Sequence, residues 1–217
     1  MKRRTLPAAA ALVATATLLL TACGSGDDKS SNNDKIAGAD TDSHTSTSPS
    51  ASAAGNAGRP HIKLPPDVTD KYENWKTGDA TQDAVLGDTA RRIDATNDAI
   101  LRGDAGARGL SFYYRDKAFS DAVAWVQAYV KADLSFTGTT RYYAPKVTLS
   151  GSSTASVVYC ADESNGFNKN RKTNKVDRTP SKNSPYVLYN TRLEKNKQGV
   201  WQTSNLISKR GAKTCAG

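Results

Sequence analysis

Histidine is almost missing from this 217-residue sequence. Its two histidines, His44 and His61, fall in a stretch of small polar residues, outside the part of the chain that carries the large apolar side chains. The usual serine and cysteine hydrolases need an imidazole to activate their nucleophile. We therefore expect neither chemistry. A Gly-x-Ser-x-Gly elbow, a phosphate-binding P-loop, a dinucleotide fingerprint and a His-Glu-x-x-His helix are also absent from the sequence.

Large apolar residues are scarce between residues 23 and 66, where Ser, Thr, Asp, Asn, Gly and Ala dominate. Such a segment cannot bury enough surface to offset the entropy lost on ordering it. We expect a disordered tether there, with a root-mean-square reach of roughly 35 Å. Both histidines lie within it.

The start of the chain is the one part that reads as a targeting signal. Residues 2–4 are basic, and the apolar run of residues 6–20 that follows is shorter than a membrane span. The run leads into Thr-Ala and then Cys23, the pattern at which bacterial lipoprotein signal peptides are cut and the cysteine is joined to diacylglycerol. We expect residues 1–22 to be a signal peptide and Cys23 to anchor the exported protein to the outer face of the bacterial cell membrane.

Two alternatives remain open for this segment. It could be an ordinary secretory signal or an uncleaved anchor instead of a lipoprotein signal. The pair Arg3-Arg4 resembles a weak twin-arginine signal, so the sequence does not decide between the general secretory route and the twin-arginine route.

Cysteine is also rare, with three in the chain. With Cys23 assigned to lipid, Cys160 and Cys215 form an even pair in an oxidising compartment, which favours a disulfide. The bridge closes a loop of about 55 residues, a constraint worth roughly 4 kcal/mol. Free reactive thiols or a metal site are the alternatives, but two cysteines without histidine do not complete a tetrahedral zinc shell. We expect no metal and no cofactor.

Residues 67–217 have the length of one folded domain. Helical spacing of apolar residues predicts a short helix over 68–75, a longer one over 81–102 and a third from Ser120. Alternation then predicts strands, listed here in chain order: 141–149, 154–162, 186–195 and 200–208. Helices followed by strands predict an α+β fold, in which N-terminal helices cover a curved, four-stranded antiparallel sheet. A ligand would bind either on the opposite face of the sheet or in the concavity between the sheet and the helices.

Acidic residues are scarce in the last quarter of the chain. Residues 67–166 hold 11 basic and 14 acidic side chains, whereas residues 167–217 hold 12 basic and 2 acidic ones. A basic segment lies between the second and third predicted strands, and its cations are Lys169, Arg171, Lys172, Lys175, Arg178 and Lys182. We expect an exposed loop that could bind anionic lipid, wall polymer or an acidic envelope protein. The alternative is a solvated loop that only aids solubility.

Nucleic acid is not an expected partner. The predicted location excludes it, and aromatic residues are not interleaved with these charges as base stacking requires.

Several features together resemble one group of proteins. The lipoprotein-like start, the helical half, the strand VVYCADES (157–164), the hairpin YNTRLEKNKQGVWQ (189–202) and the cysteine near the end are similar to small secreted lipoproteins of actinobacteria. Those resemble the nuclear-transport-factor-2-like superfamily of cone-shaped α+β domains. The resemblance implies the fold but no single function, because that superfamily includes isomerases, cyclases, dehydratases and interaction modules.

Two functional hypotheses follow. The first is a non-catalytic, lipid-anchored binding or accessory module of the cell envelope. The second is a small-molecule enzyme of the cone-fold type. Its pocket would use Asp116, Asp162 or Glu163 with one of five tyrosines: Tyr113, Tyr114, Tyr142, Tyr143 or Tyr159. A purely structural envelope component is a third possibility. A cavity and its lining discriminate among them.

Overall fold

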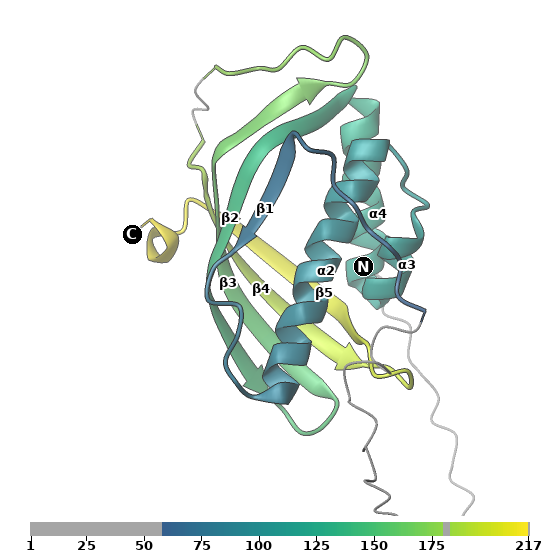
Figure 1. Ribbon diagram of the computed structural model, residues 1–217, viewed down its shortest axis with the longest axis vertical. Helices are drawn as coiled ribbons and strands as arrows, with labels where there is room; N and C mark the ends of the chain where they lie inside the picture. The colour runs from purple at the N-terminus through teal and green to yellow at the C-terminus, as the bar shows by residue number, and fades with distance from the viewer. Residues whose placement is uncertain (1–57, 180–182, 217) are drawn as a thin grey trace, which may run out of the picture. The chain divides into compact units, whose positions relative to one another are not determined.

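The computed structural model describes residues 58–179 and 183–216. The predicted signal peptide, Cys23, most of the predicted tether and Lys182 lie outside these residues. In the described part, three helices lie on the inner face of a curved, five-stranded sheet (Figure 1). The elements are β1 (Val68–Tyr72), α2 (Ala80–Arg102), α3 (Arg108–Tyr113), α4 (Asp116–Lys131), β2 (Leu134–Leu149), β3 (Thr154–Asn170), β4 (Tyr186–Lys195), β5 (Trp201–Arg210) and the short 3-10 turn η1 (Lys213–Cys215). The predicted α+β fold, with helices on a curved sheet, is confirmed.

Local signals fix the ends of α2, close to the predicted range 81–102. The Asp79 carboxylate accepts hydrogen bonds from the backbone N–H groups of Thr81 and Gln82 at 3.0 and 2.8 Å, which satisfies two donors of the first turn. Gly103 ends the helix at φ 69°, a left-handed conformation that glycine adopts without strain. The buried face of the helix then packs on the sheet.

The other helices depart from the prediction. The helix expected from Ser120 begins four residues earlier, at Asp116, and the six-residue helix α3 was not predicted. The helix that begins at Asp116 ends at Lys131, and Leu134 is the first residue of β2. Both predicted strands before residue 170 are also longer than expected, since β2 starts at 134 and β3 runs to 170.

The predicted helix over 68–75 is wrong. Val68–Tyr72 forms β1, which pairs in parallel with Gly138–Tyr142 of β2. The sheet therefore has a parallel edge strand in addition to the four predicted antiparallel ones, and its order is β1-β2-β3-β4-β5. The apolar residues at 68 and 72 are also consistent with one face of a strand, because residues i and i+4 share a face in both structures.

Curvature arises in β2. Its pairing with β3 shifts register between Thr139 and Arg141 and again between Tyr143 and Lys146, and such irregularities bend and twist a strand. Gly138 precedes the first shift with φ 102°, and a Cβ atom there would overlap the carbonyl oxygen of Asn165. Only glycine fits this close approach of two strands.

The two faces of β3 pack against different parts of the domain. Ala155, Val157 and Tyr159 face the helices and are buried, whereas Cys160 faces the other side of the sheet. There Cys160 forms a disulfide with Cys215, and the two Cα atoms are 5.6 Å apart. The predicted pairing is thus present, and it holds η1 against the outer face of the sheet (Figure 1).

The structured part begins before residue 67, the predicted boundary. Arg59 forms an ion pair with Asp88 of α2, whose side chain is 1% exposed. The same carboxylate accepts the backbone N–H of Trp201 at 2.9 Å, so it joins the incoming chain to both α2 and β5. Ile62 packs beside Ala95. The segment from 58 to 66, assigned to the tether by its composition, is therefore part of the fold.

Candidate ligand-binding cavity

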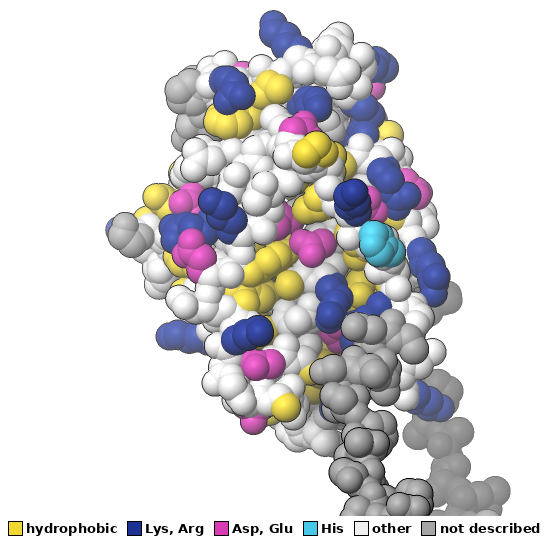
Figure 2. Space-filling view, viewed as in Figure 1, with side chains coloured by type: hydrophobic (Ala, Val, Ile, Leu, Met, Phe, Trp, Pro, Cys, Tyr) yellow, Lys and Arg dark blue, Asp and Glu magenta, His cyan; other side chains and the backbone are white. Residues whose placement is uncertain are grey.

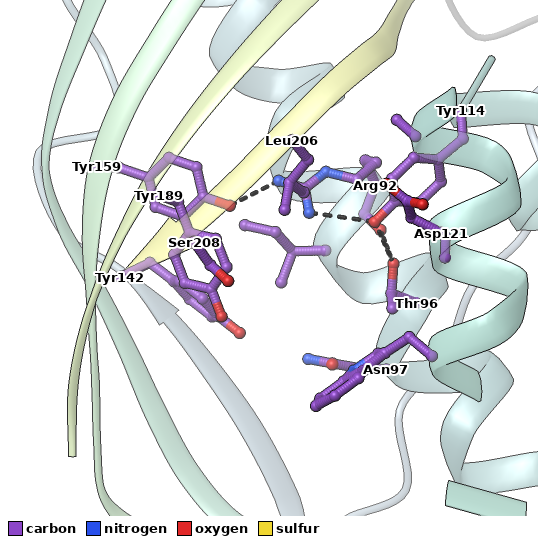
Figure 3. A pocket seen from close by; sticks show the side chains of 14 residues that line it. Arg92, Thr96, Asn97, Tyr114, Asp121, Tyr142, Tyr159, Tyr189, Leu206 and Ser208 are labelled. Carbon is purple, nitrogen blue, oxygen red and sulfur yellow. Dashed lines mark hydrogen bonds between the residues drawn. The ribbon is translucent and has the colours of Figure 1, made fainter. Parts of the chain in front are cut away.

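A cavity of about 320 Å³ lies between the helices and the inner face of the sheet. Its helical side carries both polar and apolar groups, among them Arg92, Thr96, Asn97, Asp121 and Trp125. Its sheet side is formed by side chains from four strands: Tyr142, Tyr159, Tyr189, Leu206 and Ser208 (Figure 3). The remainder of the lining includes Tyr114, which follows α3. The elements thus bring one cation and four phenol rings to the walls of one cavity.

Arg92 is the most unusual side chain of the cavity, because it is charged and only 4% exposed. Its Nη2 donates to the Tyr159 hydroxyl at 2.6 Å and its Nη1 to the Tyr114 hydroxyl at 3.3 Å. Its Nε is buried and has no hydrogen-bond partner among the residues that the structure describes. Burial lowers the pKa of Arg92, but the two phenols outweigh this and the net shift is upward, so the guanidinium stays charged.

Helical spacing explains how α2 places these groups. Thr89, Arg92 and Thr96 follow one another at i, i+3 and i+7, so they share one face of the helix. The Thr96 Oγ1 is 2.9 Å from the Tyr114 hydroxyl and also 2.9 Å from the Arg92 carbonyl oxygen. The tyrosine is thereby held against the helix at the edge of the cavity.

The sheet tyrosines are placed by strand register. Tyr159 of β3 and Tyr189 of β4 are direct cross-strand partners, and their rings stack with centroids 5.0 Å apart. Tyr142 of β2 lies on the other side of Tyr159 at 6.2 Å. Figure 3 shows the hydroxyl groups of these tyrosines pointing from the sheet toward the helices. Burial raises the pKa of all three phenols, so they are protonated at neutral pH.

A cluster of hydrogen-bonded polar side chains lies behind the cavity wall. Asn97 donates from Nδ2 to Asp70 of β1 at 2.7 Å, and Tyr72 donates to Asp94 of α2 at 2.6 Å. Burial, followed by the charge of nearby Asp94, raises the pKa of Asp70 to about 7 although Asn97 opposes the shift. Neither carboxyl group lines the cavity itself.

Of the predicted pocket residues, the structure brings Tyr114, Tyr142 and Tyr159 into this cavity, but none of the three acids. Asp162 lies 3.4 Å from Arg141, and Glu163 lies 2.6 Å from Arg210, so both carboxylates pair with arginines elsewhere. Asp116 begins α4 and is exposed. The predicted combination of these acids with a tyrosine in one pocket is not formed.

Sequence reasoning missed Arg92. A helical arginine is usually a surface charge. The available signal was its spacing: Val85, Thr89, Arg92 and Thr96 occupy the same face as the apolar residues that pack on the sheet.

The predicted basic segment is not a free loop at its start. Lys169 lies within β3 and pairs with Asp67 at 3.0 Å, and Lys172 pairs with Asp133 at 2.7 Å. The Arg171 guanidinium donates to backbone carbonyl oxygens, including that of Leu101 at 2.8 Å. These three cations therefore have partners within the domain.

The rest of the segment is more open. The Arg178 guanidinium lies over the ring of Phe167 at 4.8 Å, and Lys175 is exposed. On the face shown in Figure 2, Lys and Arg side chains are spread over the surface with Asp and Glu among them, and they do not form one continuous patch. His61 is exposed and does not line the cavity.

Residues 58–179 and 183–216 hold no group of three or more His, Cys, Asp or Glu side chains arranged to bind a metal ion. None of the helices in the same ranges has the length and apolar character needed to cross a membrane.

Comparison with known proteins gives likeness in structure alone. No family model matches the sequence, and no curated protein does. A ketosteroid isomerase-like protein from Erwinia carotovora atroseptica is 22% identical, with 57% of this chain and 93% of that chain covered and a TM-score of 0.38. An NTF-2 like protein of unknown function from Shewanella oneidensis is 17% identical, with coverages of 56% and 96% and a TM-score of 0.36. The chain is similar to these proteins in fold, and the likeness assigns it no activity.

Proposed function

We propose that this chain is a lipid-anchored, extracytoplasmic binding module of the bacterial cell envelope, which takes a small molecule into the cavity without transforming it. The observation that carries the proposal is the cavity of about 320 Å³ with the buried, charged Arg92 in its wall. Its volume lies at the lower end of the range for small-molecule sites, and its mixture of aromatic walls with a few directed polar groups is typical of them.

The groups of the lining favour binding over catalysis. Asp121 is the carboxylate among the lining residues, and its two oxygens lie 2.6 and 2.8 Å from the Lys117 ammonium. The buried tyrosines have raised pKa values, so they are hydrogen-bond donors at neutral pH and poor proton acceptors. The described lining therefore contains one carboxylate, which is held by Lys117, and no histidine.

The binding proposal is tested by filling the cavity. Ala122 of α4 lines the cavity and is buried, so Ala122→Leu places additional carbon atoms in its space. Ala124 of the same helix is exposed, and Ala124→Leu is the matched control. A library of neutral and anionic aromatic fragments, including 2-naphthoate and 2-naphthamide, is screened by ligand-observed NMR. We expect binders of the wild type and of Ala124→Leu that Ala122→Leu no longer binds. The proposal would be contradicted if the wild type bound none of the fragments. It would also be contradicted if Ala122→Leu bound the same fragments as the wild type.

The anchoring part has a separate test. If Cys23 carries the lipid, the wild type labels with radioactive palmitate in the producing bacterium and sediments with membranes. Cys23→Ala should lose the label and leave the membrane fraction. A Cys23→Ala protein that still sediments with membranes would instead support an uncleaved anchor.

An enzyme of the cone-fold type, such as an isomerase, cyclase or dehydratase, is the second candidate. It is favoured by the buried Asp70, whose pKa of about 7 suits proton transfer and which contacts the lining residue Asn97. Each fragment or natural ligand that binds is recovered after incubation and its mass and NMR spectrum compared with the starting compound. Recovery of unchanged ligand supports the binding module, whereas a product that disappears with Asp70→Asn supports the enzyme.

A further inference from the structure

We propose that the ligand of this cavity is a small organic monoanion, with a carboxylate seated beside Arg92 and Tyr159 and an apolar or aromatic body along the tyrosine wall. The inference rests on the proposed binding function and adds the chemical class of the ligand. It follows from the charge of the cavity, from the directions of its hydrogen bonds and from the character of its walls.

The first step is charge. Burying a cation away from water is costly unless an anion compensates it. The partners of the Arg92 guanidinium are two neutral phenols, and among the described residues it forms no ion pair with a carboxylate. By contrast, Asp88, one turn earlier in α2, pairs with both Arg59 and Arg91. The Arg92 guanidinium therefore lies in the cavity wall with no carboxylate in contact with it, because Asp121, the carboxylate of the described lining, pairs with Lys117.

The second step accounts for the protons. Thr96 has one hydroxyl proton, and it donates that proton to the Arg92 carbonyl oxygen at 2.9 Å. The 2.9 Å contact between Thr96 and the Tyr114 hydroxyl must then be a hydrogen bond donated by Tyr114. Both protons are therefore used within the protein. Tyr114 and Thr96 position Arg92 and are not the donors that a ligand would find.

Tyr159 differs in this respect. Its oxygen accepts the short bond from Arg92 Nη2 at 2.6 Å, and its own proton has no acceptor among the described residues. The Arg92 Nε–H is likewise buried without a partner. The two unused donors come from groups joined by one hydrogen bond, so they are close together. A carboxylate has two acceptor oxygens and would satisfy both donors while neutralising the guanidinium.

The third step is the body of the ligand. Beside these donors the cavity is bounded by the rings of Tyr142 and Tyr189, by Ile93 and by Leu206 (Figure 3). Such walls favour an apolar or aromatic group over a sugar or a peptide. A single cation in the lining favours one negative charge, since a dianion would bring a second charge into the cavity without compensation.

The test uses a pair of probes that differ in charge but little in shape, 2-naphthoate and 2-naphthamide. Their dissociation constants are measured by calorimetry on the full domain of the wild type and of three variants. Arg92→Gln removes the cavity cation. Arg102→Gln makes the same change in net charge on the same helix, but at an exposed position, 56% accessible, where the arginine pairs with Asp98. Tyr159→Phe removes the hydroxyl whose proton is unused, and with it the acceptor of the Arg92 Nη2 hydrogen bond.

We expect the wild type and Arg102→Gln to bind 2-naphthoate at least about tenfold more tightly than 2-naphthamide. Arg92→Gln should reduce this ratio to about one, and Tyr159→Phe should weaken naphthoate binding about tenfold with little effect on the amide. Thermal unfolding identifies a variant that fails to fold; if Arg92→Gln does so, Tyr159→Phe decides the matter.

The contrary outcomes are distinct. Equal binding of both probes by the wild type would overturn the monoanion inference and leave the binding function standing. A preference for naphthoate that survives both Arg92→Gln and Tyr159→Phe would overturn it as well. Failure of the wild type to bind any compound of the fragment library would contradict the proposed function, and the inference would fall with it.

Discussion

Removing the disulfide between Cys160 and Cys215 should destabilise the domain by several kcal/mol. The two residues are 55 positions apart, and the entropy of closing a loop of that length is worth about 4 kcal/mol. For a domain of this size the free energy of unfolding falls by about 2 kcal/mol per molar urea. The double variant Cys160→Ala, Cys215→Ala should therefore unfold at a urea concentration about 2 M below that of the wild type.

The assay is equilibrium urea unfolding, followed through tryptophan fluorescence. Trp201 is 1% exposed and should report loss of the core. Lys213→Ala serves as the control, because this exposed residue lies in the same turn as Cys215 and takes no part in the bridge. A chemical reductant applied to the wild type should reproduce the double variant. A midpoint shift below about 0.5 M would mean that the reduced, unfolded chain retains structure and that loop entropy does not stabilise this fold.

Three further perturbations test the fold and its electrostatics. Gly138→Ala should lower stability by about 2–4 kcal/mol in thermal unfolding, because the added Cβ meets the Asn165 carbonyl at a φ of 102°; an unchanged melting temperature would contradict this. Asp88→Asn should cost about 3 kcal/mol by urea unfolding, since it removes the buried charge that pairs with Arg59. In the folded state the pKa of Asp70 is raised to about 7 from an ordinary value of 3.8, so the folded state binds this proton more tightly than the unfolded state does. The free energy of unfolding should therefore fall as pH rises between these two values and then level off. Asp70→Asn should flatten that dependence, as measured by urea unfolding at pH 5 and pH 8, and an unaltered slope would refute the assignment.

The elements that the sequence predicts well are those with local signals. The range of α2 follows from its apolar spacing and from Gly103, and β4 occupies residues 186–195, the predicted range. By contrast, β1 is stabilised by parallel pairing with residues about 70 positions away, and no local pattern shows that pairing. Its apolar residues fit a helix and a strand equally well, so the sequence alone could not choose between them.

The site was less predictable than the fold, for the same reason. Tyr159 was identifiable because alternation in β3 separates it from Cys160 and assigns it to the inner face. Arg92 becomes a cavity residue only when the tyrosines of three strands meet α2, an arrangement set by tertiary packing. Asp162 and Glu163 stand at the end of a predicted strand, where the sequence suggests pocket acids, but they pair with Arg141 of β2 and Arg210 of β5.

The attachment of Arg59 to Asp88 has a mechanical consequence. A pulling force applied to the chain from its N-terminal side acts on the Arg59–Asp88 ion pair before it acts on any strand, because Arg59 precedes β1 in the chain. Asp88 also holds the Trp201 amide, so the load divides between α2 and β5. The segment 58–66 is then the first part of the described domain that such a force would detach, once the Arg59–Asp88 ion pair breaks.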